Sequence, residues 1–144
     1  MSHSASILAL KIGCESFILI GIAMVLSVFT PLGAVLELFL DLAVWPGDGA
    51  QTLDAVETRL GIAISGGLLA GWATMILMVV THVYSKDKAL GGRIIAVSAL
   101  VWFALDSFGS VMAGAAMNVV FNLGFLLVLL VPLALARERR VAAA

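Results

Sequence analysis

The sequence predicts an all-α membrane protein in which four transmembrane helices form an antiparallel bundle and a short interfacial helix lies on its outer face. Of the 144 residues, 62% are hydrophobic and only 12% are charged, whereas about a quarter of the residues in a soluble domain are charged. Four apolar stretches reach the length of about 20 residues that a bilayer crossing requires. Because the connections between them are short, residues 1–144 are expected to form a single membrane domain.

The first crossing is predicted at about residues 8–30, and Pro31 ends it because proline cannot continue a helix. It contains two charges, Lys11 and Glu15, which lie four residues apart and therefore share one face of the helix. We interpret them as an intramembrane ion pair near the inner end. The alternative is that Glu15 is a carboxylate that binds a proton or a cation.

Residues 32–45 are too few to cross a bilayer, and most of their apolar side chains fall on the face opposite Glu37 and Asp41. This amphipathic pattern, followed by Trp45, is typical of a helix that lies in the membrane interface. The whole connection as far as Arg59 holds five acidic residues against one arginine. We expect a solvated acidic loop rather than a cation site, because the acids do not follow the spacing of a calcium-binding loop.

The second crossing is predicted at about residues 60–82, with small residues along one stripe of the helix. Gly67 and Gly71 form a GxxxG pattern, and Thr74 continues the same stripe. Small residues allow a neighbouring helix to approach closely in a membrane. These three residues, together with Gly109 in the third crossing, are the predicted helix-packing positions.

The third crossing is predicted at about residues 94–117 and the fourth at about residues 118–136. At a rise of about 1.5 Å per residue, Asp106 falls within about one residue of the bilayer midplane. Trp102, Asp106 and Ser110 share one face of the third helix. That face is expected to point into the bundle, because a carboxylate that faces lipid is costly.

A tight turn joins the third and fourth crossings, so Ser110 and Asn122 are expected at about the same depth. The predicted buried polar cluster consists of Trp102, Asp106, Ser107, Ser110, Asn118 and Asn122. No cation lies at the depth of Asp106, so this carboxyl group is expected either to be neutral or to be held by hydrogen-bond donors.

The charges of the connections predict the orientation in the membrane. Residues 85–93 carry three cations and one acid, and the C-terminal tail carries Arg137, Arg139 and Arg140 against Glu138. Lysine and arginine in short loops favour the cytoplasmic side. We therefore expect a multi-pass protein of the inner (plasma) membrane with both termini in the cytoplasm.

Enzymatic function is disfavoured. A hydrolase or transferase needs a nucleophile with its base, or a metal held by several histidines and acids. The only histidines are His3 in the N-terminal tail and His82 at the end of a crossing, and Cys14 is the only cysteine. We expect no catalytic residue, no metal and no cofactor, and nothing in the charge distribution indicates nucleic acid.

Two non-enzymatic functions are consistent with the sequence. The first is a small accessory or scaffold subunit, which packs against copies of itself or against a larger membrane complex. In that case the polar cluster joins the third helix to the fourth. The second is a proton-coupled transporter of a small molecule that works as an oligomer, with Asp106 as the titrating carboxylate.

Overall fold

The computed structural model describes residues 1–136, and all regular elements within this range are helical. They are α1 (His3–Ser27), α2 (Gly33–Val44), α3 (Val56–Val79), the π-helical turn η1 (Val80–Tyr84), α4 (Lys88–Met112) and α5 (Asn118–Leu135). Four of the helices are long and apolar enough to cross a membrane. This confirms the all-α class and the predicted number of helices that are apolar enough to span a membrane. The charged residues 137–140, which were used to predict the orientation, lie outside the described residues.

The helix ends differ from the predicted crossings because caps and turns set them rather than hydrophobicity. The helix α1 begins at His3, since the Ser2 hydroxyl accepts a hydrogen bond from a backbone N–H of the first turn at 3.1 Å. The helix α4 begins directly after Asp87, which caps it in the same way. It ends at Met112, five residues earlier than expected, and Gly114 follows with a φ of +83°.

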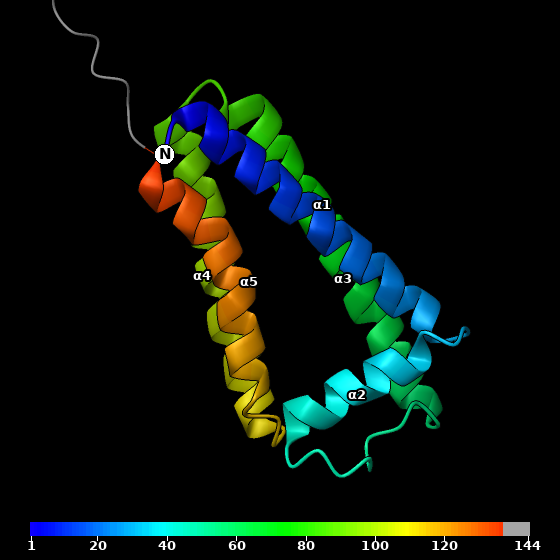
Figure 1. The fold of residues 1–144 in the computed structure, drawn as a ribbon. Helices are drawn as coiled ribbons and strands as arrows, with labels where there is room; N and C mark the ends of the chain where they lie inside the picture. The colour runs from blue at the N-terminus through cyan, green and yellow to red at the C-terminus, as the bar shows by residue number, and fades with distance from the viewer. Residues whose placement is uncertain (137–144) are drawn as a thin grey trace, which may run out of the picture.

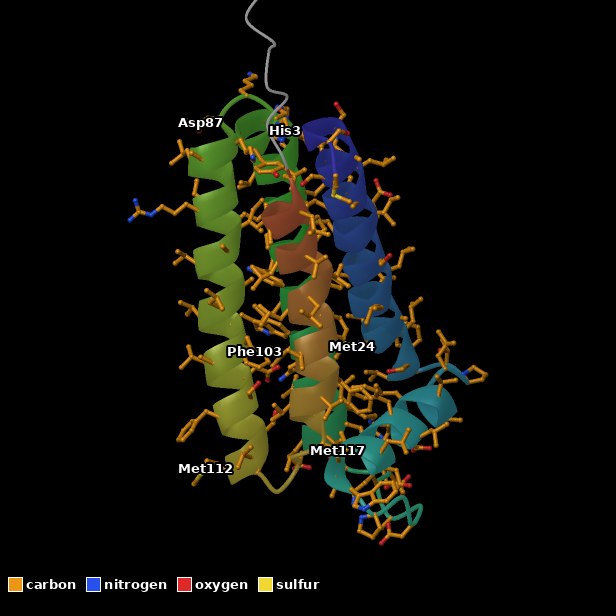
Figure 2. The ribbon with its side chains drawn as sticks, turned by 60° about the vertical axis from the view of Figure 1, so that its left-hand side comes forward. His3, Met24, Asp87, Phe103, Met112 and Met117 are labelled. Carbon is orange, nitrogen blue, oxygen red and sulfur yellow. The ribbon has the colours of Figure 1, made fainter. Side chains whose placement is uncertain are left out.

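The helices form two pairs that meet at one end of the molecule and diverge toward the other. The helix α1 packs along α3, and α4 packs along α5. The short helix α2 lies across the diverging end, where it contacts both α1 and α5 (Figure 1). We call the end where the two pairs meet the closed end, and the end where they diverge the open end. Figure 2 shows His3 and Asp87 at the closed end, and Met112 and Met117 at the open end.

Two glycines make a close backbone contact between α1 and α3. A Cβ atom placed on Gly66 would lie 2.6 Å from the carbonyl oxygen of Gly21, and one on Gly21 would lie 2.5 Å from that of Gly66. The predicted packing residues Gly67, Gly71 and Thr74 instead lie exposed on α3, and a Cβ atom on either glycine would meet nothing within 4 Å. Successive residues of a helix point about 100° apart, so the glycine next to the GxxxG pattern makes the tight contact within the chain.

The closed end is organised around Tyr84, whose side chain is only 1% exposed. Its hydroxyl group lies 2.9 Å from the Ser6 hydroxyl, which also donates to the carbonyl oxygen of Pro132 at 2.8 Å. The ring of His3 stacks edge-on against the tyrosine with 4.8 Å between centroids. Hydrogen bonds and stacking at Tyr84 thus join η1 to α1 and α5.

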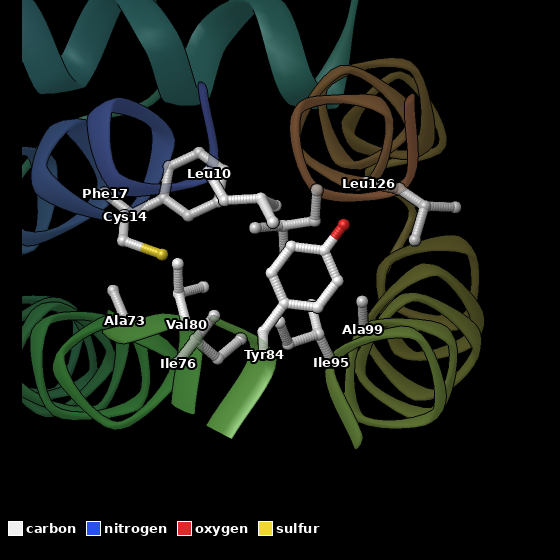
Figure 3. Packing of buried hydrophobic residues seen from close by; sticks show 11 residues of the cluster. Leu10, Cys14, Phe17, Ala73, Ile76, Val80, Tyr84, Ile95, Ala99 and Leu126 are labelled. Atoms are coloured by element: carbon white, nitrogen blue, oxygen red, sulfur yellow. The ribbon is translucent and has the colours of Figure 1, made fainter. Parts of the chain in front are cut away.

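The apolar core continues from Tyr84 into the closed half of the molecule (Figure 3). It consists of Leu10, Cys14, Phe17, Ala73, Ile76, Val80, Tyr84, Ile95, Ala99, Leu126 and Leu129. These residues come from α1, α3, η1, α4 and α5, so every long helix contributes to it. The core holds the two helix pairs together there, and the polar residues of α4 and α5 lie beyond it, toward the open end.

Met1 and Ala136, the first and last residues that the structure describes, both lie at the closed end. The N-terminal ammonium donates to the carbonyl oxygen of Leu135 at 2.9 Å. The Lys88 ammonium, at the start of α4, donates to the carbonyl oxygen of Ala136 at 2.8 Å. The cationic loop between η1 and α4 is therefore gathered with the N-terminus and the end of α5.

The acidic connection at the open end uses its carboxylates to fix its own backbone. Asp41, only 7% exposed, accepts a hydrogen bond from the backbone N–H of Gly49 at 2.9 Å. Glu37 accepts one from the backbone N–H of Leu53 at 2.8 Å, and the Arg59 guanidinium donates to the carbonyl oxygen of the same leucine. The acids of α2 therefore hold the following loop against the helix.

Candidate functional site

A cavity of about 840 Å³ lies between the two helix pairs. All five helices contribute to its lining, which is mostly aliphatic and aromatic. The polar side chains in the lining are Ser65, Asp106, Asn118 and Asn122, and the aromatic ones are Phe39, Trp72, Trp102, Phe121 and Phe125. A large apolar cavity with a few polar groups is the usual form of a small-molecule site.

Two hydrogen bonds between side chains join α4 to α5 beside this cavity. The Asn118 amide donates to the Ser110 hydroxyl at 2.9 Å, and the Asn122 amide donates to the Ser107 hydroxyl at a longer 3.4 Å. The sequence predicted that Ser110 lies at the same depth as Asn122. This prediction is wrong by about one helical turn, because Ser110 bonds to Asn118 instead. The helix α4 ends at Met112, five residues before the predicted end of the third crossing, and α5 begins at Asn118.

Asp106 takes no part in these bonds. Its half-buried side chain lines the cavity, and no group within residues 1–136 donates a hydrogen bond to its carboxylate. The serines and asparagines expected to hold it are paired with one another instead. The carboxyl group of Asp106 is therefore free to interact with whatever enters the cavity.

Aromatic rings from both helix pairs face the cavity. The indoles of Trp72 on α3 and Trp102 on α4 have centroids 5.6 Å apart, and Phe125 on α5 lies 6.3 Å from Trp102. The indole N–H of Trp72 donates to the Ser98 hydroxyl at 2.9 Å, which fixes the ring in place. Trp102, which the sequence placed in the polar cluster, therefore forms part of an aromatic wall.

The helix α2 covers the open end of the cavity. Its residues Leu36 and Phe39 belong to the lining. Phe39 stacks against Phe121 of α5 with 4.9 Å between ring centroids. This contact joins α2, which follows α1 in the chain, to the pair of α4 and α5. The helix α2 therefore forms one boundary of the cavity.

The structure leaves the other predicted polar residues outside the cavity. Lys11 is half-buried and Glu15 is exposed on α1, and within the described chain their charged groups do not come within ion-pair distance. Four-residue spacing permits an ion pair but does not enforce one, because both long side chains would lose rotamer freedom. Gly109 is exposed on α4, and His82 is exposed on η1.

The chemistry available at the site is that of a single carboxyl group in an apolar, aromatic cavity. Within residues 1–136, no three histidine, cysteine or acidic side chains are grouped closely enough to hold a metal ion. Asp106 could hold a proton or form an ion pair with an organic cation. The amides of Asn118 and Asn122 could donate to or accept from a polar group on a ligand.

The sequence did not reveal the aromatic wall or the Tyr84 contacts. Trp72 and Phe125 lie within long apolar stretches, where an aromatic residue is as common facing lipid as facing a cavity. Ser6 lies in a segment expected to be a tail before the first helix. The only signal at Tyr84 was its position beside a cationic loop, which is typical of an interfacial tyrosine.

We expect loss of the Asn118–Ser110 bond to weaken the α4–α5 pair. Asn118→Ala should lower the free energy of unfolding by about 0.6 to 2 kcal/mol, the range of hydrogen bonds between membrane helices. The measurement is reversible unfolding of the purified protein in mixed micelles. In a double-mutant cycle, adding Ser110→Ala should cost little more. Fully additive losses would mean that the two side chains do not interact.

Comparison of this chain with protein families, with curated proteins and with solved structures finds no match.

Proposed function

We propose that the chain crosses the inner (plasma) membrane as an antiparallel four-helix bundle, with both termini in the cytoplasm and α2 in the outer interface. The closed end carries the loop and the start of α4 around Asp87, with the cationic residues Lys86, Lys88 and Arg93, and the acidic connection lies at the open end (Figure 2). This distribution supports the orientation through the preference of lysine and arginine for the cytoplasmic side. Because α4 runs from Lys88 to Met112, its midpoint lies near residue 100. In this orientation Asp106, predicted at the bilayer midplane, lies with the cavity in the outer half of the membrane.

Within this frame, we propose that the protein exchanges a proton for a small molecule at Asp106. One observation supports this role over a purely structural one: the Asp106 carboxylate lines the cavity and accepts no hydrogen bond from the described residues. An aspartate that served to join α4 to α5 would be held by donors on the facing helix. Serine–asparagine pairs make that connection instead.

A transport pathway requires more than one copy of so short a chain, because four helices rarely enclose one alone. The exposed stripe of Gly67, Gly71 and Thr74 on α3 offers a face on which a second copy could pack closely. The same stripe favours the second candidate function, an accessory or scaffold subunit of a larger membrane complex. Both functions are non-enzymatic.

The test of the exchange function is an infrared pH titration of the protein in lipid vesicles. We expect a protonated-carboxyl band that titrates and that Asp106→Asn removes, since the amide keeps the size of the side chain but binds no proton. Glu15→Gln is the matched control, because Glu15 is exposed on α1 outside the cavity. The Asp106 band should survive in this variant.

A wild-type spectrum in which no band depends on Asp106 would contradict the exchange function. Native mass spectrometry of the same variants in lipid separates it from the scaffold function. If Asp106→Asn dissociates an oligomer or complex while no carboxyl band depends on Asp106, the scaffold function is supported instead.

A further inference from the structure

We propose that the cavity between the helix pairs binds an organic cation with a single positive charge and an apolar, aromatic body. This inference rests on the proposed exchange at Asp106 and adds the class of ligand. It follows from three properties of the lining: its charge, its aromatic rings and its scarcity of oxygen ligands.

The charge of the lining is that of one carboxylate. Asp106 is the only acidic or basic side chain among the residues that surround the cavity, although α1, α2, α3 and α5 all contribute to it. An uncompensated charge is costly in an apolar surrounding unless an opposite charge or a proton neutralises it. A monovalent cation neutralises Asp106, whereas an anion would add a second negative charge.

The aromatic rings select an organic cation over a hydrated one. Trp72, Trp102 and Phe125 all line the cavity, and their neighbouring ring centroids lie 5.6 and 6.3 Å apart. Tryptophan and phenylalanine faces attract cations, most strongly where water is excluded. The same rings bury the hydrocarbon part of an amphipathic ligand.

A small inorganic cation does not fit this lining. Calcium takes six to eight oxygen ligands and magnesium requires an octahedron of them. The oxygen-bearing side chains of the cavity are Ser65, Asp106, Asn118 and Asn122, and only one of them is charged. A lipid chain would fill the apolar part of the cavity but would leave the Asp106 carboxylate without an opposite charge. The lining therefore favours the organic cation.

The experiment measures binding of tetraphenylphosphonium to the full chain in lipid nanodiscs by equilibrium dialysis. Protein-free nanodiscs of the same lipid correct for partition into the bilayer. We expect saturable binding at one site per chain, and no saturable binding of tetraphenylborate, which has a similar size and shape but carries the opposite charge. Asp106→Asn should weaken binding of the phosphonium at least about tenfold, which corresponds to about 1.4 kcal/mol.

Two further variants complete the design. Asp106→Glu retains the charge and should keep the affinity within a few-fold of the wild type, which shows that the loss in the asparagine variant is not misfolding. Glu15→Gln removes a carboxylate outside the cavity and should leave binding unchanged.

Several outcomes would overturn the inference: equal binding of the borate, an equal loss in Glu15→Gln, or no saturable binding above protein-free nanodiscs. Equal binding of both ions would indicate an apolar occupant such as a lipid chain. Failure of the proposed exchange is distinguishable from failure of this inference. Phosphonium binding without a titrating Asp106 leaves the ligand class standing, whereas a titrating Asp106 without phosphonium binding leaves only the exchange.

Discussion

Replacing Gly66 by alanine is expected to destabilise the α1–α3 pair by about 1 to 3 kcal/mol, the usual effect of overpacking a close contact. The added methyl carbon would lie 2.6 Å from the carbonyl oxygen of Gly21 and 2.9 Å from the Cβ atom of Met24. Because the first of these is backbone, the clash can be relieved only by moving the helices apart. Loss of the close approach also loses the dispersion contacts that hold membrane helices together.

A glycine of α3 outside the Gly67, Gly71 and Thr74 stripe supplies a matched control. Gly61→Ala introduces the same methyl group in the same helix, but nothing lies within 4 Å of it. We expect this variant to be neutral or slightly more stable, since alanine favours helix over glycine. Both are measured by unfolding in mixed micelles. Equal destabilisation by the two variants would show that α1 and α3 do not approach at Gly66.

Truncation of Tyr84 is expected to have the largest effect on the closed end. Tyr84→Ala should lower the free energy of unfolding by about 3 to 5 kcal/mol, the range for aromatic side chains removed from a packed core. The ring is 1% exposed and lies in the core cluster between η1, α1 and α4 (Figure 3). The partner groups Ser6 and His3 would also lose their contacts with it.

The hydroxyl group and the ring of Tyr84 can be separated experimentally. Tyr84→Phe keeps the ring and removes only the bond to Ser6, which still donates to Pro132. We expect it to cost about 1 kcal/mol. Phe108→Ala is a control for aromatic truncation in general, because Phe108 is 67% exposed on α4. An equally small effect of Tyr84→Ala would mean that the closed end is not held by this residue.

These two contacts explain how a short membrane chain maintains a cavity. Gly66 fixes one helix pair, and the core around Tyr84 joins the two pairs in the closed half of the molecule. Beyond that core, the serine–asparagine bonds fix the second pair, and α2 bridges the open end through Phe39. The two pairs therefore remain apart at the depth of Asp106.

The sequence by itself determined the class of the protein and the number of its crossings. Hydrophobic length and the scarcity of charge are properties of local segments, so they predict four apolar helices without knowledge of their packing. The periodicity of α4 also placed Trp102 and Asp106 on the inward face, because the opposite face carries only apolar residues.

Only the tertiary structure decided which polar groups meet. The register between α4 and α5 depends on how the two helices pack, and it pairs Ser110 with Asn118 rather than with the predicted Asn122. Asp106 is left facing the cavity. The tertiary structure also decided that Gly66, and not Gly67, contacts α1. Neighbouring residues of a helix point about 100° apart, so only one of the two glycines can face α1. Helical patterns specify faces, but the angle and offset between helices specify contacts.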